Sequence, residues 1–426
     1  MGLKGYDWAG QAIAGNGDAD GDGLFDVLVG APGNDQGNEG AGQVYLLSGQ
    51  QLQAEQPRSI DDHVVFTALG EGNCAGTSVS FIMDINGDSQ DEILIGEPCN
   101  KRVYLFYGGT QSATLDQANY IFEGEAAGDY TGWSIASAGD MNGDGKGDFV
   151  VGADGADNVA FSCGNAFLVL SSGLSSEGLH PIVQVATEFW GSTEAEKLGS
   201  AVGGGGDIDG DGLHDILIGA SGYGQGGVAY IVLAADIDFY SMGLIKDIAL
   251  PFFGEAHEKV GSSLSTAGDI DDDGLHDVLI GAPASVYTQN LPGHTYVLTG
   301  EQITQQDYGH PFAIVEGNLG DHTGQSVSPA GDFDGDGSVD ILLGAPSLYN
   351  HNEGGAAYVY SGSVLANGGT HFVEDAQLKL SAENNGDLFG FSAATLGGDG
   401  LLIGAPGIDG DEPDVGGFYF FPRAMD

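Results

Sequence analysis

Basic residues are scarce in this chain. Its 426 residues include 10 Lys and Arg against 62 Asp and Glu, which gives a formal net charge of −52 at pH 7. Such a surface repels phosphate backbones and anionic lipid headgroups, so the charge argues against binding to nucleic acid or to an anionic membrane. With 41% hydrophobic residues and 76 glycines, the composition is neither that of a disordered chain nor that of collagen.

Long apolar runs are missing as well. No stretch of 18 apolar residues occurs, so we expect no membrane insertion. The first residues, Met1 to Tyr6, lack the apolar core of a signal peptide. We interpret Met1 as the start of a fragment from an extracellular or cell-surface protein whose signal peptide is not in this chain. A cytoplasmic protein is the alternative.

Motifs of common catalytic sites are also absent. The sequence contains no Gly-x-Ser-x-Gly elbow, no phosphate-cradling glycine loop and no His-Glu-x-x-His pair. We therefore predict that the chain is not an enzyme and has no catalytic residues.

What the sequence does contain is one short acidic pattern in six copies. The first copy, Asp18-Ala-Asp-Gly-Asp-Gly-Leu-Phe-Asp26, has carboxylates at positions 1, 3, 5 and 9 and a glycine at position 6. Position 7 can add a backbone carbonyl. Oxygen ligands crowded on a short loop suit Ca²⁺ better than a transition metal. We predict one Ca²⁺ per loop, about six in all.

The predicted ligands are positions 1, 3, 5, 7 and 9 of each loop. They are Asp18, Asp20, Asp22, Leu24 and Asp26; Asp84, Asn86, Asp88, Gln90 and Glu92; Asp140, Asn142, Asp144, Lys146 and Asp148; Asp207, Asp209, Asp211, Leu213 and Asp215; Asp269, Asp271, Asp273, Leu275 and Asp277; and Asp332, Asp334, Asp336, Ser338 and Asp340. The second loop, with Asn86, Ser89 and Glu92, is predicted to be the weakest site. The side chain of Lys146 should point outward, and we interpret His214 and His276 at position 8 as outward-facing turn residues. The alternative is that all six loops are solvated acidic turns that bind no metal.

The spacing of these loops predicts the fold. Their first residues follow one another at intervals of 56 to 67 residues, and each interval reads as four short strands with almost no helix. A seventh, degraded copy runs from Leu388 to Pro406, keeps one acidic residue and should bind no metal. We predict one all-β domain over residues 1–426, a seven-bladed β-propeller of four-stranded antiparallel blades with the calcium loops between first and second strands. The predicted blades are residues 6–69, 70–124, 125–191, 192–254, 255–317, 318–382, and 383–426 with 1–5.

The sequence resembles a known repeat family. Gly-Ala-Pro follows the loop at Gly30, Gly281, Gly344 and Gly404, and a Phe-Gly-like start precedes it. This combination is similar to the FG-GAP repeats of the propeller at the head of integrin α-subunits and of related bacterial surface proteins. The resemblance covers essentially the whole chain and implies the same propeller fold, an adhesive role and a bacterial integrin-like surface protein as the parent. The chain contains no Asn-x-Ser/Thr sequon, which fits a bacterial or an unglycosylated source.

One feature of integrins is not matched. In that family, aromatic residues after the Phe-Gly glycine form a cage around the central channel that receives a basic residue of the β-subunit. The matching positions are Gln11, Thr77, Trp133, Ser200, Ser262, Gln325 and Phe391. Only two are aromatic, and the chain contains no Arg-Gly-Asp, which argues against an integrin-type β-subunit as a partner.

The three cysteines leave two readings. Cys74 and Cys99 should lie at the same end of two neighbouring antiparallel strands, so they could form a disulfide, with Cys163 left over. The alternative is three buried thiols. The absence of Cys-x-x-Cys argues against zinc or redox chemistry.

We predict that ligands bind on loops opposite the calcium loops. The longer connections there are Asn34 to Ala41, Ala284 to Pro292 and Ser347 to Gly354, with Tyr287, Tyr349 and His351 as candidate anchors or ordinary packing residues. The leading hypothesis is a non-enzymatic, calcium-binding module for adhesion or protein recognition, with an unknown protein or glycan partner. The alternatives are a carbohydrate-binding or catalytic propeller accessory to a hydrolase or lyase, and an architectural spacer. We expect blade 7 to be short or three-stranded.

Overall fold

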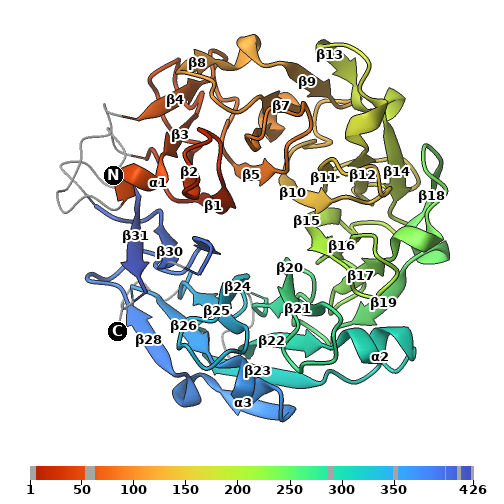
Figure 1. Ribbon diagram of the computed structural model, residues 1–426, viewed down its shortest axis with the longest axis vertical. Helices are drawn as coiled ribbons and strands as arrows, with labels where there is room; N and C mark the ends of the chain where they lie inside the picture. Colours follow the sequence, from red (N-terminus) through yellow and green to blue (C-terminus); the bar gives the residue numbers. More distant parts are fainter. Residues whose placement is uncertain are drawn as a thin grey trace.

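The computed structural model describes residues 6–52, 63–285, 291–348, 354–398, 400–409 and 414–423. In it the chain forms seven β-sheets arranged in a ring, each sheet being one blade of a propeller (Figure 1). The predicted all-β, seven-bladed propeller is confirmed. The positions that fall outside the described residues include Met1 to Gly5, Tyr287, Tyr349, His351 and Asp399.

Blades 1 to 6 each contain four antiparallel strands that succeed one another along the chain. They are β1 (Ala12–Gly17), β2 (Asp26–Ala31), β3 (Gln43–Leu47) and β4 (Val64–Thr67) in blade 1; β5 (Ser78–Ile82), β6 (Glu92–Glu97), β7 (Arg102–Phe106) and β9 (Tyr120–Glu123) in blade 2; β10 (Ser134–Gly139), β11 (Asp148–Ala153), β12 (Asn165–Val169) and β14 (Ala186–Trp190) in blade 3; β15 (Leu198–Gly206), β16 (Asp215–Ala220), β17 (Val228–Val232) and β19 (Leu250–Phe253) in blade 4; β20 (Ser263–Gly268), β21 (Asp277–Ala282), β22 (Pro292–Leu298) and β23 (Ala313–Leu319) in blade 5; and β24 (Ser326–Gly331), β25 (Asp340–Ala345), β26 (Ala356–Tyr360) and β28 (Leu378–Ser381) in blade 6.

Four blades also carry a fifth strand, which the sequence did not predict. Each lies between the third and fourth strands of one blade and pairs in parallel with the fourth strand of the preceding blade. The four are β8 (Ala113–Thr114), β13 (Gly178–Pro181), β18 (Met242–Leu244) and β27 (Gly369–Phe372). They are only two to four residues long, too short for an alternating pattern to be recognised in the sequence.

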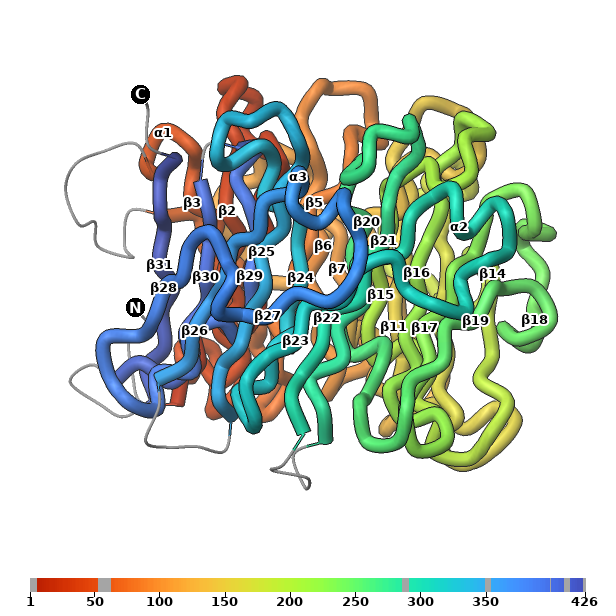
Figure 2. Tube along the Cα trace, turned by 90° about the horizontal axis from the view of Figure 1, so that it is seen from below, coloured from red at the N-terminus to blue at the C-terminus, as the bar shows by residue number. Residues whose placement is uncertain are grey.

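Within the described residues, helical structure is confined to single turns. The α-helical turns are α1 (Gly49–Leu52), α2 (Gly300–Thr304) and α3 (Gly362–Leu365), and the 3₁₀ turns are η2 (Pro98–Asn100), η3 (Leu115–Gln117), η4 (Ser171–Gly173), η5 (Ile182–Gln184), η6 (Ala234–Asp236), η7 (Ile245–Asp247) and η8 (Val373–Asp375). Several of them directly follow a third strand, at the end of the blade where the acidic loops lie. Figure 2 shows the disk from the side, with α1 and α3 toward its upper face.

The hydrophobic core lies between the blades. The second strand of every blade is buried along its whole length, because it has apolar residues on both faces and lies between neighbouring blades. Among the described residues, seven apolar clusters fill the seven spaces between neighbouring blades. Between blades 1 and 2, for example, Leu28 and Phe66 pack with Ile93 and Phe106, and the two phenylalanine rings are 4.7 Å apart.

The glycine that begins Gly-Ala-Pro and the glycine of the Phe-Gly-like motif meet at each junction between two blades. Gly30, at the end of β2, lies so close to Gly76 of blade 2 that a Cβ on Gly30 would overlap the Gly76 carbonyl oxygen. Gly76 has φ +86°, a conformation that favours glycine, and its N–H donates to the carbonyl of Gly96 (2.9 Å). The same contact recurs at every junction, including Gly404 of blade 7 against Gly10 of blade 1.

Blade 7 contains three strands in the described residues: β29 (Ala393–Thr395), β30 (Gly400–Ala405) and β31 (Gly417–Pro422). This agrees with the expected short or three-stranded blade. The ring closes where blade 1 meets blade 7, as Figure 1 shows by the red β1 and β2 beside the blue β30. There Ala9 and Gly416 form a parallel bridge, and the Ser392 hydroxyl donates to the carbonyl of Gly10 (2.8 Å).

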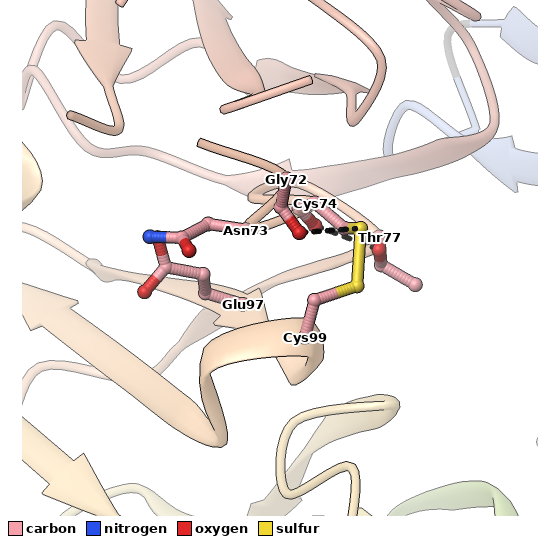
Figure 3. The surroundings of a disulfide bond; sticks show 6 residues. All are labelled: Gly72, Asn73, Cys74, Thr77, Glu97 and Cys99. Atoms are coloured by element: carbon pink, nitrogen blue, oxygen red, sulfur yellow. Dashed lines mark hydrogen bonds between the residues drawn. A yellow bond between two sulfur atoms is a disulfide. The ribbon is translucent and has the colours of Figure 1, made fainter. Parts of the chain in front are cut away.

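Cys74 and Cys99 form a disulfide, which decides between the two readings of the cysteines (Figure 3). Their Cα atoms are 5.8 Å apart. The bridge joins the segment before β5 to η2 after β6, at the face opposite the acidic loops. Beside it, the Asn73 side chain donates to Glu97 Oε1 (2.9 Å). Cys163 is a buried free thiol.

Replacing Cys74 and Cys99 together by serine should lower the free energy of unfolding by about 2–4 kcal/mol, because the bridge restricts the unfolded chain. Denaturant unfolding with and without a reducing agent measures this difference. The reductant should shift the midpoint of the wild type and leave that of the double variant unchanged. A wild-type midpoint that is insensitive to reductant would contradict a stabilising bridge.

Candidate metal centres

The six acidic loops occupy equivalent places in blades 1 to 6. Each connects the first strand of a blade to the second, and position 9 is the first residue of the second strand in all six: Asp26, Glu92, Asp148, Asp215, Asp277 and Asp340. Because the strands form an antiparallel meander, all six loops lie on one face of the disk, and the connections from second to third strands lie on the other.

Four loops bring three carboxylates together. One oxygen from each residue lies within 4.8 Å of the other two in the groups Asp18, Asp20 and Asp22; Asp207, Asp209 and Asp215; Asp269, Asp271 and Asp273; and Asp332, Asp334 and Asp336. The second and third loops have Asn86 and Asn142 at position 3, and such a group is not found in them among the described residues. A compact set of carboxylate oxygens is the donor set that a hard divalent cation requires.

Backbone N–H groups hold the carboxylates in place. In the first loop, the N–H groups of Gly21 and Gly23 donate to the two oxygens of Asp18 (2.8 and 2.9 Å). The N–H of Leu24 donates to Asp22 Oδ1 (2.8 Å), and position 7 makes this bond to position 5 in all six loops. These bonds preorganise the side chains at positions 1 and 5, two of the predicted ligands.

The position-9 carboxylate has a second task that the sequence did not reveal. Buried Asp26 accepts the N–H of Ala19 from its own loop on Oδ2 (2.9 Å) and the N–H of Gly49, just after β3, on Oδ1 (2.9 Å). The same pair of bonds occurs at Asp148, Asp215, Asp277 and Asp340. Position 9 thus joins the loop to the third strand of its blade. A small residue after the third strand was the only sequence signal of this contact.

Glu92 is the exception among these six. Its Oε2 accepts the N–H of Ile85 (3.0 Å), whereas Oε1 is buried with no hydrogen-bond partner in the described part of the chain. A buried carboxylate oxygen without a donor is costly unless a proton or a cation compensates it.

Burial makes the position-9 carboxylates hard to ionise. Loss of water raises the pKa of Asp26, Asp215 and Asp277 to about 7, and other carboxylates of the same loops add to this increase. Burial likewise raises the pKa of Asp148 to about 6 and that of Glu92 to about 8. The donor set, the crowded negative charge and the unpaired oxygen of Glu92 all fit a bound cation.

Side chains at positions 7 and 8 face the neighbouring loop, which corrects two expectations. Lys146 does not point away from the protein; its Nζ donates to the carbonyl of Ile85 in the second loop (2.8 Å). His214 and His276 are half-buried rather than outward-facing. The Nδ1 atom of His214 accepts the N–H of Asp140 in the third loop (2.9 Å).

The opposite face displays aromatic side chains on blade 3. Trp133, one of the two aromatics at the integrin cage positions, is 43% exposed and lies 6.1 Å, centroid to centroid, from exposed Tyr130. The connection from β11 to β12 adds Val159 and Phe161, which is 69% exposed. The sequence had pointed to other loops on this face, and their candidate anchors lie outside the described residues.

Comparison with protein families identifies the repeats. The FG-GAP repeat model matches residues 11–47, 198–232, 260–298 and 323–360, and the FG-GAP-like repeat model matches residues 84–151. Together these segments make up about half of the chain. They include the whole acidic loop of each of blades 1 to 6.

Curated relatives include integrin α-subunits. The chain is 30% identical to integrin alpha pat-2 of Caenorhabditis briggsae over 50% of this chain and 18% of that protein. It is 26% identical to integrin alpha-5 of Xenopus laevis over 65% of this chain and 27% of that protein. A phosphatidylinositol-glycan-specific phospholipase D of Dictyostelium discoideum is 28% identical over 51% of this chain and 26% of that protein. The chain spans about a fifth to a quarter of the length of these relatives.

A solved structure shares the architecture. The crystal structure of BBS1N in complex with ARL6DN, soaked with lead, matches 100% of this chain and 94% of that chain with a TM-score of 0.53 and 9% identity. This likeness shows the fold alone. Within the described residues, none of the helices is long and apolar enough to cross a membrane. The repeat matches, the integrin relatives and the seven-bladed ring agree, and the chain belongs to the FG-GAP repeat family as an integrin-α-like β-propeller.

Proposed function

We propose that this propeller is a calcium-stabilised, non-enzymatic recognition module of an extracellular or cell-surface protein that acts in adhesion or protein recognition. The observation that carries the proposal is the set of acidic loops on one face of an integrin-α-like propeller, four of which bring three carboxylates together. A bacterial source stays a prediction.

Calcium is the favoured cation because every predicted side-chain ligand offers oxygen. When bound, it would supply positive charge to the carboxylates at positions 1, 3, 5 and 9 and hold the two ends of each loop together. At free calcium a hundredfold above its dissociation constant, one site adds about 2.7 kcal/mol to the stability of the folded state. Several such sites would make the metal part of the fold.

Two observations favour an extracellular setting. The Cys74–Cys99 disulfide is a bond that persists in oxidising compartments and is rare in the cytosol. The integrin α relatives are consistent with the same setting.

The ligand is proposed to bind the face opposite the acidic loops. Aromatic side chains are enriched at protein interfaces, where tyrosine and tryptophan often dominate the binding energy, and Tyr130, Trp133 and Phe161 expose such rings on blade 3. A protein or a glycan could use this surface, since both pack against aromatic rings.

An accessory role beside a hydrolase is the second candidate. The relative that favours it is the Dictyostelium phospholipase D, of which this chain matches 26%. The two candidates differ in what the parent protein does, and both use the propeller to bind.

Removing calcium should lower the melting temperature sharply, because the crowded carboxylates repel one another without a cation. We expect about six calcium ions per chain by elemental analysis of protein equilibrated with calcium. Thermal melting in calcium and in excess EDTA provides the second measurement. Equal melting temperatures together with no bound metal would exclude calcium as part of the fold.

The metal-free protein should lose stability as the pH rises. An acid whose pKa is raised on folding contributes stability that is complete below its unfolded pKa and is lost as the pH passes its folded pKa. For Asp26, Asp215 and Asp277 this window runs from about pH 4 to about pH 7. Melting temperatures in EDTA should fall across the window, and saturating calcium should reduce the fall. High salt serves as a control, because it screens repulsion between exposed charges but has little effect on buried ones.

Trp133→Ala should weaken ligand binding at least about tenfold, since truncating a central aromatic anchor commonly costs this much. Arrays of extracellular proteins and glycans, probed with the propeller in calcium and in EDTA, would provide the ligands for this measurement. Phe372→Ala removes an exposed aromatic from β27 on the outer rim and is the matched control. Calcium-dependent ligands that bind both variants equally would place the binding surface elsewhere.

A further inference from the structure

Neighbouring acidic loops are joined by backbone hydrogen bonds at position 8. In three pairs of adjacent blades, the N–H at position 8 of one loop donates to the carbonyl at position 1 of the preceding loop. These bonds run from Asp91 to Asp18 (3.0 Å), from His214 to Asp140 (3.1 Å) and from His276 to Asp207 (3.0 Å). Position 1 is the first predicted metal ligand of its loop, so each bond reaches a neighbour's candidate site.

In two of these pairs the side chain at position 8 makes a second bond. His214 Nδ1 accepts the N–H of Asp140 (2.9 Å), and Asp91 Oδ2 accepts the N–H of Asp18 (2.9 Å). The N–H and the carbonyl of the first ligand are then both held by one residue of the next blade. The third pair lacks the second bond: His276 Nδ1 is buried without a hydrogen-bond partner in the described part of the chain.

Position 7 adds a packing contact to the same neighbour. Leu213 lies over the position-4 glycine of the third loop, where a Cβ on Gly143 would be 3.2 Å from its Cδ2 atom. Gln90 and Leu275 make the equivalent contacts with Gly21 and Gly210. In these three pairs the later loop therefore supports the preceding loop through position 7, itself a predicted ligand, and through position 8, which lies between the predicted ligands at positions 7 and 9.

We propose that His214 is a positioning residue for the metal site of the third loop, and that Asp91 has the same role for the first loop. The inference rests on the proposed calcium binding. Asp140 accepts the N–H groups of Gly143 and Gly145 (both 2.7 Å) on its carboxylate. Fixing its peptide groups from outside the loop sets the direction in which that carboxylate points. The third loop has Asn142 in place of an acid, so it depends more on a correctly placed Asp140.

The same bonds imply a coupling between neighbouring sites. An ion in the fourth loop would fix positions 7 and 9 around His214, and His214 in turn holds Asp140. Occupation of either of these two loops should therefore favour occupation of the other, since coupling between two binding sites is reciprocal, and the two calcium sites should fill cooperatively.

The test compares two histidines at the same loop position. His214→Ala removes a side-chain bond to the preceding loop, whereas His276→Ala removes a ring that makes none, and both variants keep the backbone bond. Calcium titration followed by native mass spectrometry and calorimetry should show one ion bound about 10–100-fold more weakly in His214→Ala, the usual cost of losing a residue that supports a metal ligand. His276→Ala should match the wild type, and His214→Asn, which keeps an acceptor, should recover most of the affinity.

The same substitution made in an Asp140→Ala variant shows which calcium site depends on His214. Asp140→Ala removes the first ligand of the third loop, and His214→Ala should have no further effect on the remaining ions in that background. At the first loop, Asp91→Asn should bind calcium more tightly than Asp91→Ala, because only the amide keeps an acceptor for the N–H of Asp18. Melting in saturating calcium confirms that each variant is folded.

Three outcomes would overturn the inference. The first is equal calcium affinity in His214→Ala and His276→Ala. The second is an undiminished effect of His214→Ala in the Asp140→Ala background. The third is a wild-type protein that binds no calcium, which would also remove the proposed function; the first two leave that function intact.

Discussion

The fold depends on a buried acid at the start of the second strand in six of its blades. Burial of that carboxylate is costly, and the cost is offset because its oxygens receive N–H groups from the loop before it and, in five of the six blades, from the turn after the third strand. It joins two connections that side-chain packing alone would leave independent. The same carboxylate closes the acidic loop, so a structural anchor and a candidate metal ligand are one residue. A blade cannot lose the first role without disturbing the second.

Much of the fold and the position of the candidate metal loops could be predicted from the sequence, because the acidic pattern is repeated. Six copies in register predict the four antiparallel strands of each blade and their order, and the acidic loop marks where the second strand begins. The short parallel strands, such as β8 and β18, could not be predicted, since two or three residues are too few to show an alternation of apolar and polar side chains. The orientation of Lys146 and His214 was also missed. A prediction made from one repeat at a time treats each loop as isolated, whereas the orientation of these two side chains depends on contacts with the neighbouring blade.

The two faces of the disk are built on different principles. On the face with the acidic loops, carboxylates accept backbone N–H groups within each loop, and in three pairs of adjacent blades backbone hydrogen bonds join one loop to the next. On the other face, the connections differ in length and in sequence, a disulfide reinforces blade 2, and aromatic side chains are exposed on blade 3. Variation is tolerated where it does not disturb the strands, which is the usual place for recognition.

The glycine contact between blades has a geometric consequence. Gly30 and Gly76 bring two blades together backbone against backbone, whereas the same blades are held apart further out by rings such as those of Phe66 and Phe106. Each interval between blades is therefore a wedge, thin at the glycines and thick at the aromatics. The angle of that wedge decides how many blades complete a circle. The curvature of the ring therefore depends on the difference between the smallest and the largest side chains at each junction, and the seven repeats of the chain complete the circle.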